Sequence, residues 1–149
     1  MLSERQGSYL KSNQHSRNNY LQAVTSLQDD LLKEVQVDCP VFHKFYPGYY
    51  IRTMLIPKGT NIIGMMHRKE SINIVLDGSI DVVIDGEKRS LNTGERFLSY
   101  PGSKKTGYTN EDTLFANVFQ TDETDYDKLE KECTYSMEEE RILIDREVK

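Results

Sequence analysis

Short runs of alternating apolar and polar residues fill the middle of this 149-residue chain, and turn residues separate them. Between Tyr49 and Ile56, for example, the alternation places Tyr50 and Arg52 on the same face of an extended strand. Turn dipeptides such as Asp77-Gly78 follow the runs at short intervals. With about ten such runs, the pattern predicts a mainly β protein, a single closed antiparallel β-barrel (jelly roll) over residues 40–121.

The segments on either side of this region have a different period. Apolar residues from Asn18 to Val35 recur every three or four positions, which predicts an amphipathic helix over residues 18–36, with Asn18 or Asn19 as its N-cap. Residues 1–17 have no such period and predict a flexible arm. Residues 122–149 predict a short C-terminal helix followed by a charged tail.

Charge and composition exclude several classes of protein. The net charge is −5, whereas non-specific nucleic-acid binding needs a basic face, so we expect none. No apolar run reaches the roughly 18 residues of a membrane span, and the N-terminal segment is too polar for a signal peptide. Two cysteines, Cys39 and Cys133, indicate reduced thiols in a cytoplasmic protein, with one long-range disulfide as the alternative.

Two sets of residues in the central region keep the spacing of known motifs. The first set is Gly59, His67 and Gly78, and the second is Gly94, Pro101 and Asn110. On these residues the chain resembles the cupin superfamily. The resemblance implies a cupin-type barrel, here with an N-terminal amphipathic helix and a short C-terminal helix.

The resemblance also implies which positions would hold the metal ion that many cupins bind. These positions are Met65, His67, Ser71 and Thr106, and Glu70 lies one residue from the place of the usual glutamate. Catalytic metal sites generally have three or more protein ligands, and Met, Ser and Thr are poor ligands for first-row divalent ions. We therefore expect no metal and no other cofactor.

Four longer segments point to a narrower group of proteins within this superfamily. The segments are the turn Pro57–Thr60, the run INIVLDG after His67, YPGSKKTGY at Tyr100–Tyr108, and NEDTLFANVFQTDETD at Asn110–Asp125. Together with the N-terminal helix, they resemble short, uncharacterised cupin-like proteins of tailed bacteriophages. The resemblance implies a phage origin, and therefore residence in the host cytoplasm or in the virion.

The candidate site is a group of polar and aromatic side chains that strand alternation turns into the barrel. His67 is either a base or hydrogen-bond donor to an anion, or a structural histidine bound to a neighbouring hydroxyl or carbonyl. An inward Arg52 requires a carboxylate or a ligand anion. Lys104 and Lys105 lie on a turn that could hold a phosphate. The expected ligand-binding residues are Tyr50, Arg52, His67, Asn73, Lys104, Lys105, Thr106, Tyr108 and Asn117. The alternative is that they fill the barrel and satisfy one another.

Three functions follow from these observations. The first is a non-enzymatic, metal-poor cupin that binds a small anionic ligand, such as a nucleotide or a sugar phosphate, or a host or phage protein. The second is a metal-independent isomerase or epimerase of sugar nucleotides, with His67 as base and Tyr50 or Tyr108 as acid. The third is a structural or assembly protein of the virion. We also expect a homodimer in which the helix from Asn18 to Val35 covers the partner's barrel.

Overall fold

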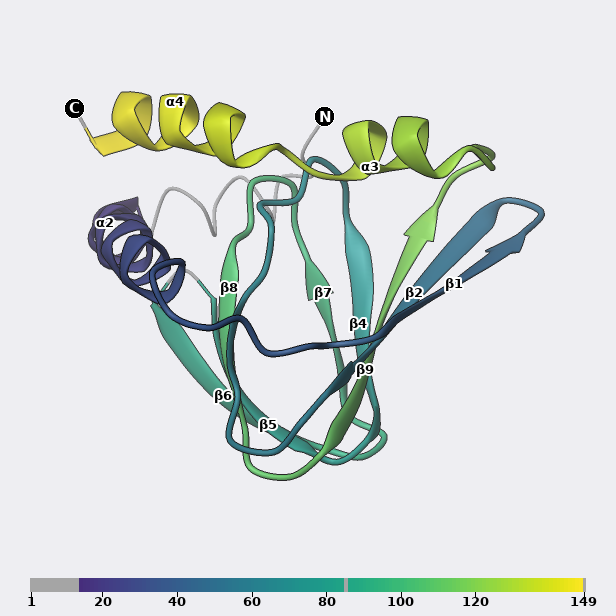
Figure 1. Ribbon diagram of the computed structural model, residues 1–149. Helices are drawn as coiled ribbons and strands as arrows, with labels where there is room; N and C mark the ends of the chain where they lie inside the picture. Colours follow the sequence, from purple (N-terminus) through teal and green to yellow (C-terminus); the bar gives the residue numbers. More distant parts are fainter. Residues whose placement is uncertain (1–13, 85, 149) are drawn as a thin grey trace.

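The computed structural model describes residues 14–84 and 86–148, and in this part of the chain two antiparallel β-sheets face each other. The strands are β1 (Val41–Tyr46), β2 (Tyr49–Ile56), β3 (Asn61–Ile63), β4 (Ser71–Asp77), β5 (Ser79–Ile84), β6 (Glu87–Asn92), β7 (Arg96–Ser99), β8 (Lys105–Thr109) and β9 (Thr113–Gln120). The helices are α2 (Gln14–Leu31), α3 (Tyr126–Cys133) and α4 (Met137–Val148). Helices α3 and α4 lie across one end of the sandwich, and α2 lies beside the four-stranded sheet (Figure 1).

The strand order confirms the predicted mainly β, cupin-type jelly roll. One sheet has the order β1-β2-β9-β4-β7, and the other has the order β3-β8-β5-β6. Consecutive strands β4 and β5 therefore lie in different sheets, as expected when a jelly roll folds back across its own core. Within the described residues, no strand pairing joins the two sheets, so they form a sandwich rather than the continuous closed barrel that we predicted.

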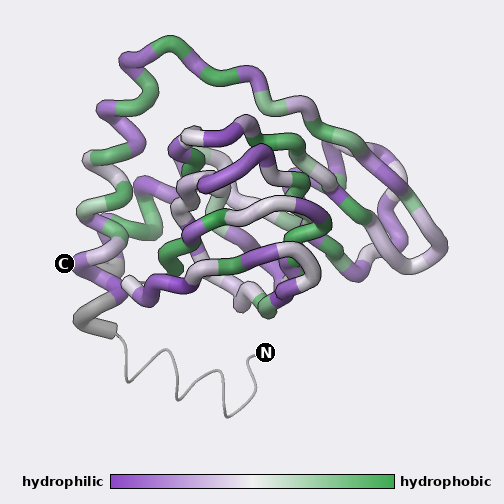
Figure 2. The backbone as a smooth tube through the Cα atoms, turned by 90° about the horizontal axis from the view of Figure 1, so that it is seen from below, coloured by the Kyte–Doolittle hydropathy of each residue, from purple (hydrophilic) through white to green (hydrophobic). Residues whose placement is uncertain are grey.

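The core of the sandwich follows from the alternation of side chains along the strands, which appears as alternating green and purple along the tube in Figure 2. The inward residues at one end are apolar and pack into a single cluster. Its buried members are Ile56, Val75, Ile80, Val82, Leu91, Phe97 and Phe115. This cluster fills part of the space between the sheets, and Ile56, Ile80, Val82 and Phe115 also line the cavity described below.

Helix α2 differs from the predicted helix at both ends. It begins at Gln14 rather than near Asn18, so the expected N-cap is wrong. It ends at Leu31, where the side-chain amide of Gln36 donates a 2.9 Å hydrogen bond to the Leu31 carbonyl oxygen, and Val35 beyond it is 96% exposed. Residues 14–17 of the predicted arm thus belong to the helix, and residues 1–13 lie outside the described part of the chain.

The first part of the apolar stripe of α2 packs on its own chain. Leu21 and Val24 are buried, and Leu21 clusters with Met66 and with Ile144 of α4. The alternative arrangement, in which the helix folds back, is therefore the one observed. Leu27 and Val35, which belong to the same predicted stripe, are exposed.

The C-terminal region contains two helices where we predicted one helix and a charged tail. Asp125 caps α3 by accepting hydrogen bonds from the backbone amides of Asp127 and Lys128. Ser136 and Glu139 form a reciprocal capping box at the start of α4, because each side chain accepts from the other's backbone amide. Within the described residues, none of the helices is long and apolar enough to cross a membrane.

Candidate functional site

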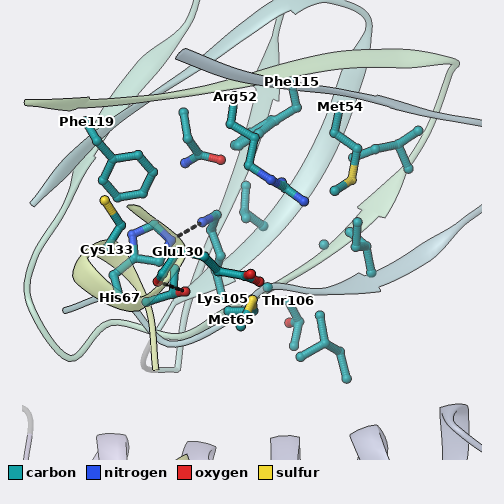
Figure 3. A pocket seen from close by; sticks show the side chains of 18 of the residues that line it. Arg52, Met54, Met65, His67, Lys105, Thr106, Phe115, Phe119, Glu130 and Cys133 are labelled. Atoms are coloured by element: carbon teal, nitrogen blue, oxygen red, sulfur yellow. Dashed lines mark hydrogen bonds between the residues drawn. The ribbon is translucent and has the colours of Figure 1, made fainter. Parts of the chain in front are cut away.

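A cavity of about 170 Å³ lies between the sheets, next to the apolar cluster, and α3 contributes one of its walls. Its walls come from β2, β3, β5, β8 and β9, from the segment that precedes β4, and from α3. Figure 3 shows that Arg52, Lys105 and His67 reach into this space from different elements. The polar and aromatic side chains among the lining residues are Tyr50, Arg52, His67, Lys105, Thr106, Phe115, Asn117, Phe119, Tyr126, Glu130 and Thr134.

A row of polar residues crosses the five-stranded sheet at the level of the cavity. Cross-strand pairing places Arg52 opposite Asn117, and Asn117 opposite Asn73. Residues paired in this way share a face of the sheet. Asn117 donates a 2.5 Å hydrogen bond to the side-chain oxygen of Asn73. The side-chain nitrogen of Asn73 in turn donates a 2.7 Å hydrogen bond to the Ser99 hydroxyl. Asn73 is fully buried and does not line the cavity, so it supports Asn117 rather than contacting a ligand.

His67 lies between β3 and β4 and is only 5% exposed. Its Nδ1 is 3.1 Å from the Ser71 hydroxyl oxygen, and its Nε2 is 3.4 Å from Nζ of Lys105, the contact drawn as a dashed line in Figure 3. Burial, reinforced by the positive charges of Lys105 and Arg52, holds the pKa of His67 well below its usual value. The imidazole is therefore neutral near pH 7, and both of its nitrogens face a polar partner.

The two consecutive lysines of the predicted phosphate-binding turn point in opposite directions. Lys105 enters the cavity, where Nζ lies 6.0 Å from the centroid of the Phe115 ring. Lys104 instead points toward the helices and is 2% exposed. Its ammonium donates to Glu140 of α4 at 2.6 Å and to Gln28 of α2 at 2.9 Å. The prediction that Lys104 binds a ligand is therefore wrong, because its charge is already neutralised within the fold.

The predicted alternation is also wrong by one position in β8. The pairing with β5 sets Val82 opposite Gly107, and Val82 is buried in the core, so Gly107 and Lys105 share the inward face. Tyr108 consequently turns outward; it is 44% exposed and does not line the cavity. Thr106 lines the cavity next to Lys105.

Tyr50 lines the cavity, as expected, but its hydroxyl contacts a histidine of the neighbouring strand. Tyr50 is 1% exposed and lines the cavity, and its hydroxyl is 2.6 Å from Nδ1 of His43 on the neighbouring strand β1. Burial, with a further contribution from Tyr126, raises the pKa of the Tyr50 hydroxyl. The phenol is therefore protonated near neutral pH, and His43, which the sequence had not singled out, is the group that holds it.

Among residues 14–84 and 86–148, the two cations of the cavity have no acidic partner. Neither Arg52 nor Lys105 forms an ion pair with any described residue, although Glu130 of α3 lines the same cavity. Burial, and the neighbouring charges of Arg52 and Lys104, lower the pKa of Lys105 to about 8. Close to neutral pH the cavity therefore contains two positive charges beside a neutral histidine.

The cavity wall that α3 contributes was not predicted from the sequence. This wall contains Tyr126, Leu129, Glu130 and Cys133. Tyr126 is three and four positions before Leu129 and Glu130, and Cys133 is three and four positions after Glu130 and Leu129. The four residues therefore share one face of the helix. That spacing was visible in the sequence, but the position of the helix over the cavity depends on long-range contacts, such as the 2.8 Å hydrogen bond from the Arg68 amide to the Cys133 carbonyl.

The residues at the positions of the usual cupin metal ligands do not fit a metal ion. His67 is the one histidine among them, and its Nε2 faces the Lys105 ammonium rather than an open coordination position. Ser71 is bound to Nδ1 of the same ring, and Met65 and Thr106 are poor ligands. Among the residues that the structure describes, no three His, Cys, Asp or Glu side chains are close enough together to bind a metal.

No protein-family model matches the sequence, and no curated protein matches it. Solved structures do match. They include KdgF from Halomonas sp., with 21% identity, 62% of this chain and 86% of that chain covered, and a TM-score of 0.53. The plu4264 protein of Photorhabdus luminescens has 16% identity, covers 64% of this chain and 86% of its own, and has a TM-score of 0.52.

A third match is the cupin domain of a XRE family transcriptional regulator from Enterobacter cloacae, with 14% identity and a TM-score of 0.50; it covers 56% of this chain and 96% of the domain. At these identities the similarity concerns the backbone arrangement, and it agrees with the spacing of the glycines in the sequence. The comparison therefore shows that this chain has the cupin fold.

Proposed function

We propose that the protein binds a small anionic ligand in the cavity between its two sheets. The observation that carries the proposal is that Arg52 and Lys105 both reach into this cavity and neither forms an ion pair with a residue in the described part of the chain. Removing a charge from water is costly unless an opposite charge or several hydrogen bonds offset the loss. A bound anion would supply that charge, and Asn117 at the same level could donate a further hydrogen bond.

The dimensions of the cavity favour the smaller ligands that we considered. A dry cavity of about 150 Å³ is known to hold a single aromatic ring. The cavity here, of about 170 Å³, is thus large enough for a short-chain acid or part of a sugar phosphate. A whole nucleotide is larger than this cavity, and the lining also includes the carboxylate side chain of Glu130. We therefore place short-chain acids and sugar phosphates before nucleotides.

Thermal unfolding of the purified protein with millimolar carboxylates, sugar phosphates and nucleotides is the test. We expect a subset of the anions to stabilise the protein, since a ligand at 100 times its Kd adds about 2.7 kcal/mol. Arg52→Gln should abolish most of this stabilisation. Arg96→Gln is the matched control, because Arg96 is an exposed arginine on a strand of the same sheet. No stabilisation by any anion, or equal stabilisation of both variants, would contradict the proposal.

Binding is preferred over isomerase or epimerase chemistry because of the positions of the two tyrosines. Tyr108 is exposed and outside the cavity lining, so a role as acid opposite His67 would fall to Tyr50. The Tyr50 hydroxyl is already bound to His43.

Bacteriophage origin and residence in the host cytoplasm are proposals that rest on the sequence resemblance alone. A structural role in the virion is the alternative, and mass spectrometry of purified particles distinguishes the two.

We further propose that the protein is a homodimer that pairs through the outer face of its five-stranded sheet. This face carries aliphatic side chains that are 40–45% exposed, namely Leu55, Ile72, Leu76 and Leu98. Ile72 and Leu98 are cross-strand partners, so they form one continuous patch. Light scattering should show a dimer for the intact chain and a monomer for Ile72→Asp. Leu27→Asp on α2, where Leu27 is 41% exposed, should leave the dimer intact. A monomeric intact chain, or dissociation by the control alone, would refute this arrangement.

A further inference from the structure

The amine of Lys105 lies in surroundings unlike those of an ordinary surface lysine. Its Nζ is 3.4 Å from Nε2 of His67 and 6.0 Å from the centroid of the Phe115 ring. It projects into a cavity that Arg52 also enters, and no described carboxylate forms an ion pair with it. Figure 3 shows the Lys105 amine between the His67 ring and the Arg52 guanidinium. The amine is thus accessible to a small molecule inside the cavity and is not occupied by a salt bridge.

These surroundings favour the neutral, nucleophilic form of the amine. Desolvation and neighbouring positive charge both disfavour an ammonium ion, and this is how proteins activate lysines for covalent chemistry. Here burial, Arg52 and Lys104 lower the pKa of Lys105 to about 8, so about half of the molecules carry the free amine at that pH. A histidine that stays neutral, with Nε2 directed at the amine, is able to carry a proton to or from it.

We propose that Lys105 forms an imine with a short-chain 2-oxo acid whose carboxylate is held by Arg52. The inference rests on the proposed binding of a small anion in this cavity and specifies the class of ligand. The lysine nitrogen forms a bond to the carbonyl carbon, and the carbonyl oxygen takes up a proton as the nitrogen loses one. The resulting carbinolamine then loses its hydroxyl together with the remaining proton on nitrogen as water, which leaves a carbon–nitrogen double bond. No oxidant or reductant takes part.

Each part of this ligand class matches one feature of the cavity. A carboxylate is the planar anion that a guanidinium recognises with two parallel hydrogen bonds. A carbonyl next to it would lie between Arg52 and the Lys105 amine, the two groups that enter the cavity from opposite sheets. A short carbon chain would suit the apolar walls formed by Met54, Ile80 and Phe115, and it would suit the small volume as well.

The test is reductive trapping of the full-length chain with pyruvate and sodium cyanoborohydride, which converts an imine to a stable amine. Intact-mass and peptide analysis should find one adduct, on Lys105, at pyruvate concentrations that leave the surface lysines unmodified. Because the adduct is located on the unaltered protein, this result does not depend on any variant. An adduct spread evenly over the lysines would overturn the proposal.

Variants then separate the roles of the two cations. Lys105→Arg keeps the positive charge but cannot form an imine, so it should lose the adduct, and Lys88→Arg on the exposed strand β6 should keep it. Arg52→Gln should reduce trapping of pyruvate at least tenfold while leaving trapping of acetaldehyde, which has no carboxylate, nearly unchanged. Equal effects on both compounds would overturn the assignment of Arg52 to the carboxylate.

The dependence on pH provides an independent measurement. The groups around the Lys105 amine are His67, Arg52, Glu130, Tyr126 and Cys133 from the cavity walls, with Lys104 beside it in the chain. Of these, His67, with its pKa held well below its usual value, stays neutral over pH 7–9. The initial rate of trapping should therefore follow the free amine of Lys105 and reach half of its maximum near pH 8. A midpoint near 10.4, the value of an exposed lysine, would overturn the proposal.

Lactate distinguishes failure of this inference from failure of the proposed function. It has the same carboxylate as pyruvate but a hydroxyl in place of the carbonyl, so it can bind through Arg52 and cannot be trapped. If pyruvate and lactate both stabilise the protein and pyruvate is not trapped, anion binding stands and the imine is refuted. If neither compound nor any other anion stabilises it and no adduct forms, both proposals are refuted.

Discussion

Replacing Glu140 with glutamine is expected to lower the free energy of unfolding by about 3–5 kcal/mol, the usual cost of removing one partner from a buried ion pair. Lys104 and Glu140 are each only 3% exposed at the side chain, and their charged atoms are 2.6 Å apart. The other carboxylate oxygen of Glu140 accepts a 2.6 Å hydrogen bond from the backbone amide of Met66. The glutamine can still accept that bond, so the loss measures the charge that Lys104 would then carry alone.

Urea unfolding of the full chain provides the measurement, with Glu138→Gln as the control. Glu138 lies in the same helix two positions away and is exposed, so its replacement should change stability by less than about 0.5 kcal/mol. The double variant Lys104→Met with Glu140→Leu should regain most of the lost stability, because it removes both charges. A loss below 1 kcal/mol for Glu140→Gln would show that the pair does not behave as a buried one.

Replacing Gly78 with alanine is expected to have an effect of similar size, about 3–5 kcal/mol, from backbone strain and atomic overlap together. Gly78 has a φ of 112° in the turn between β4 and β5, a conformation that residues with a Cβ rarely adopt. A Cβ there would lie 2.5 Å from the Asp112 carbonyl oxygen and 2.8 Å from Cα of Thr113. Both neighbours are backbone atoms, so they cannot rotate away.

Gly94→Ala is the matched control for this substitution. Gly94 also has a positive φ, of 88°, but a Cβ there meets nothing within 4 Å. It should therefore show the backbone cost alone, about 1–2 kcal/mol. The comparison is made by thermal and urea unfolding of both variants. Equal losses would mean that the turn at Gly78 can move away from β9 and that the calculated overlap has no energetic consequence.

The strands were predictable where one face of a strand is clearly apolar or clearly buried. The alternation in β2 placed Tyr50 and Arg52 inward, and both line the cavity. The sequence of β8, KTGYT, has no apolar alternation, so its orientation depends on its pairing with β5, which is not local information. For this reason the predicted orientation of β8 was wrong. Tyr108 was expected in the cavity, but it is exposed.

The candidate site was predictable only in part, for two physical reasons. Lys104 lies just before β8 and binds Glu140 and Gln28 of the helices, whereas Lys105 enters the cavity, and this difference depends on helices that lie far away in the sequence. The wall formed by Leu129, Glu130 and Cys133 depends on where α3 lies after the chain has folded. His67 was identified correctly as an interior residue, but its contact with Lys105 depends on the packing of two segments 38 positions apart.

The position of Glu140 also has a consequence for the synthesis of this protein on the ribosome. The hydrogen bonds that join Glu140 to Met66 and to Lys104 span 74 and 36 positions of the chain. Strands such as β5 and β6 can pair as soon as their short turn has emerged, because their partners are local. Lys104, in contrast, has no neutralising partner until α4 leaves the ribosomal tunnel. The local hairpin of β5 and β6 can therefore form before the interior contact that joins Lys104 to α4.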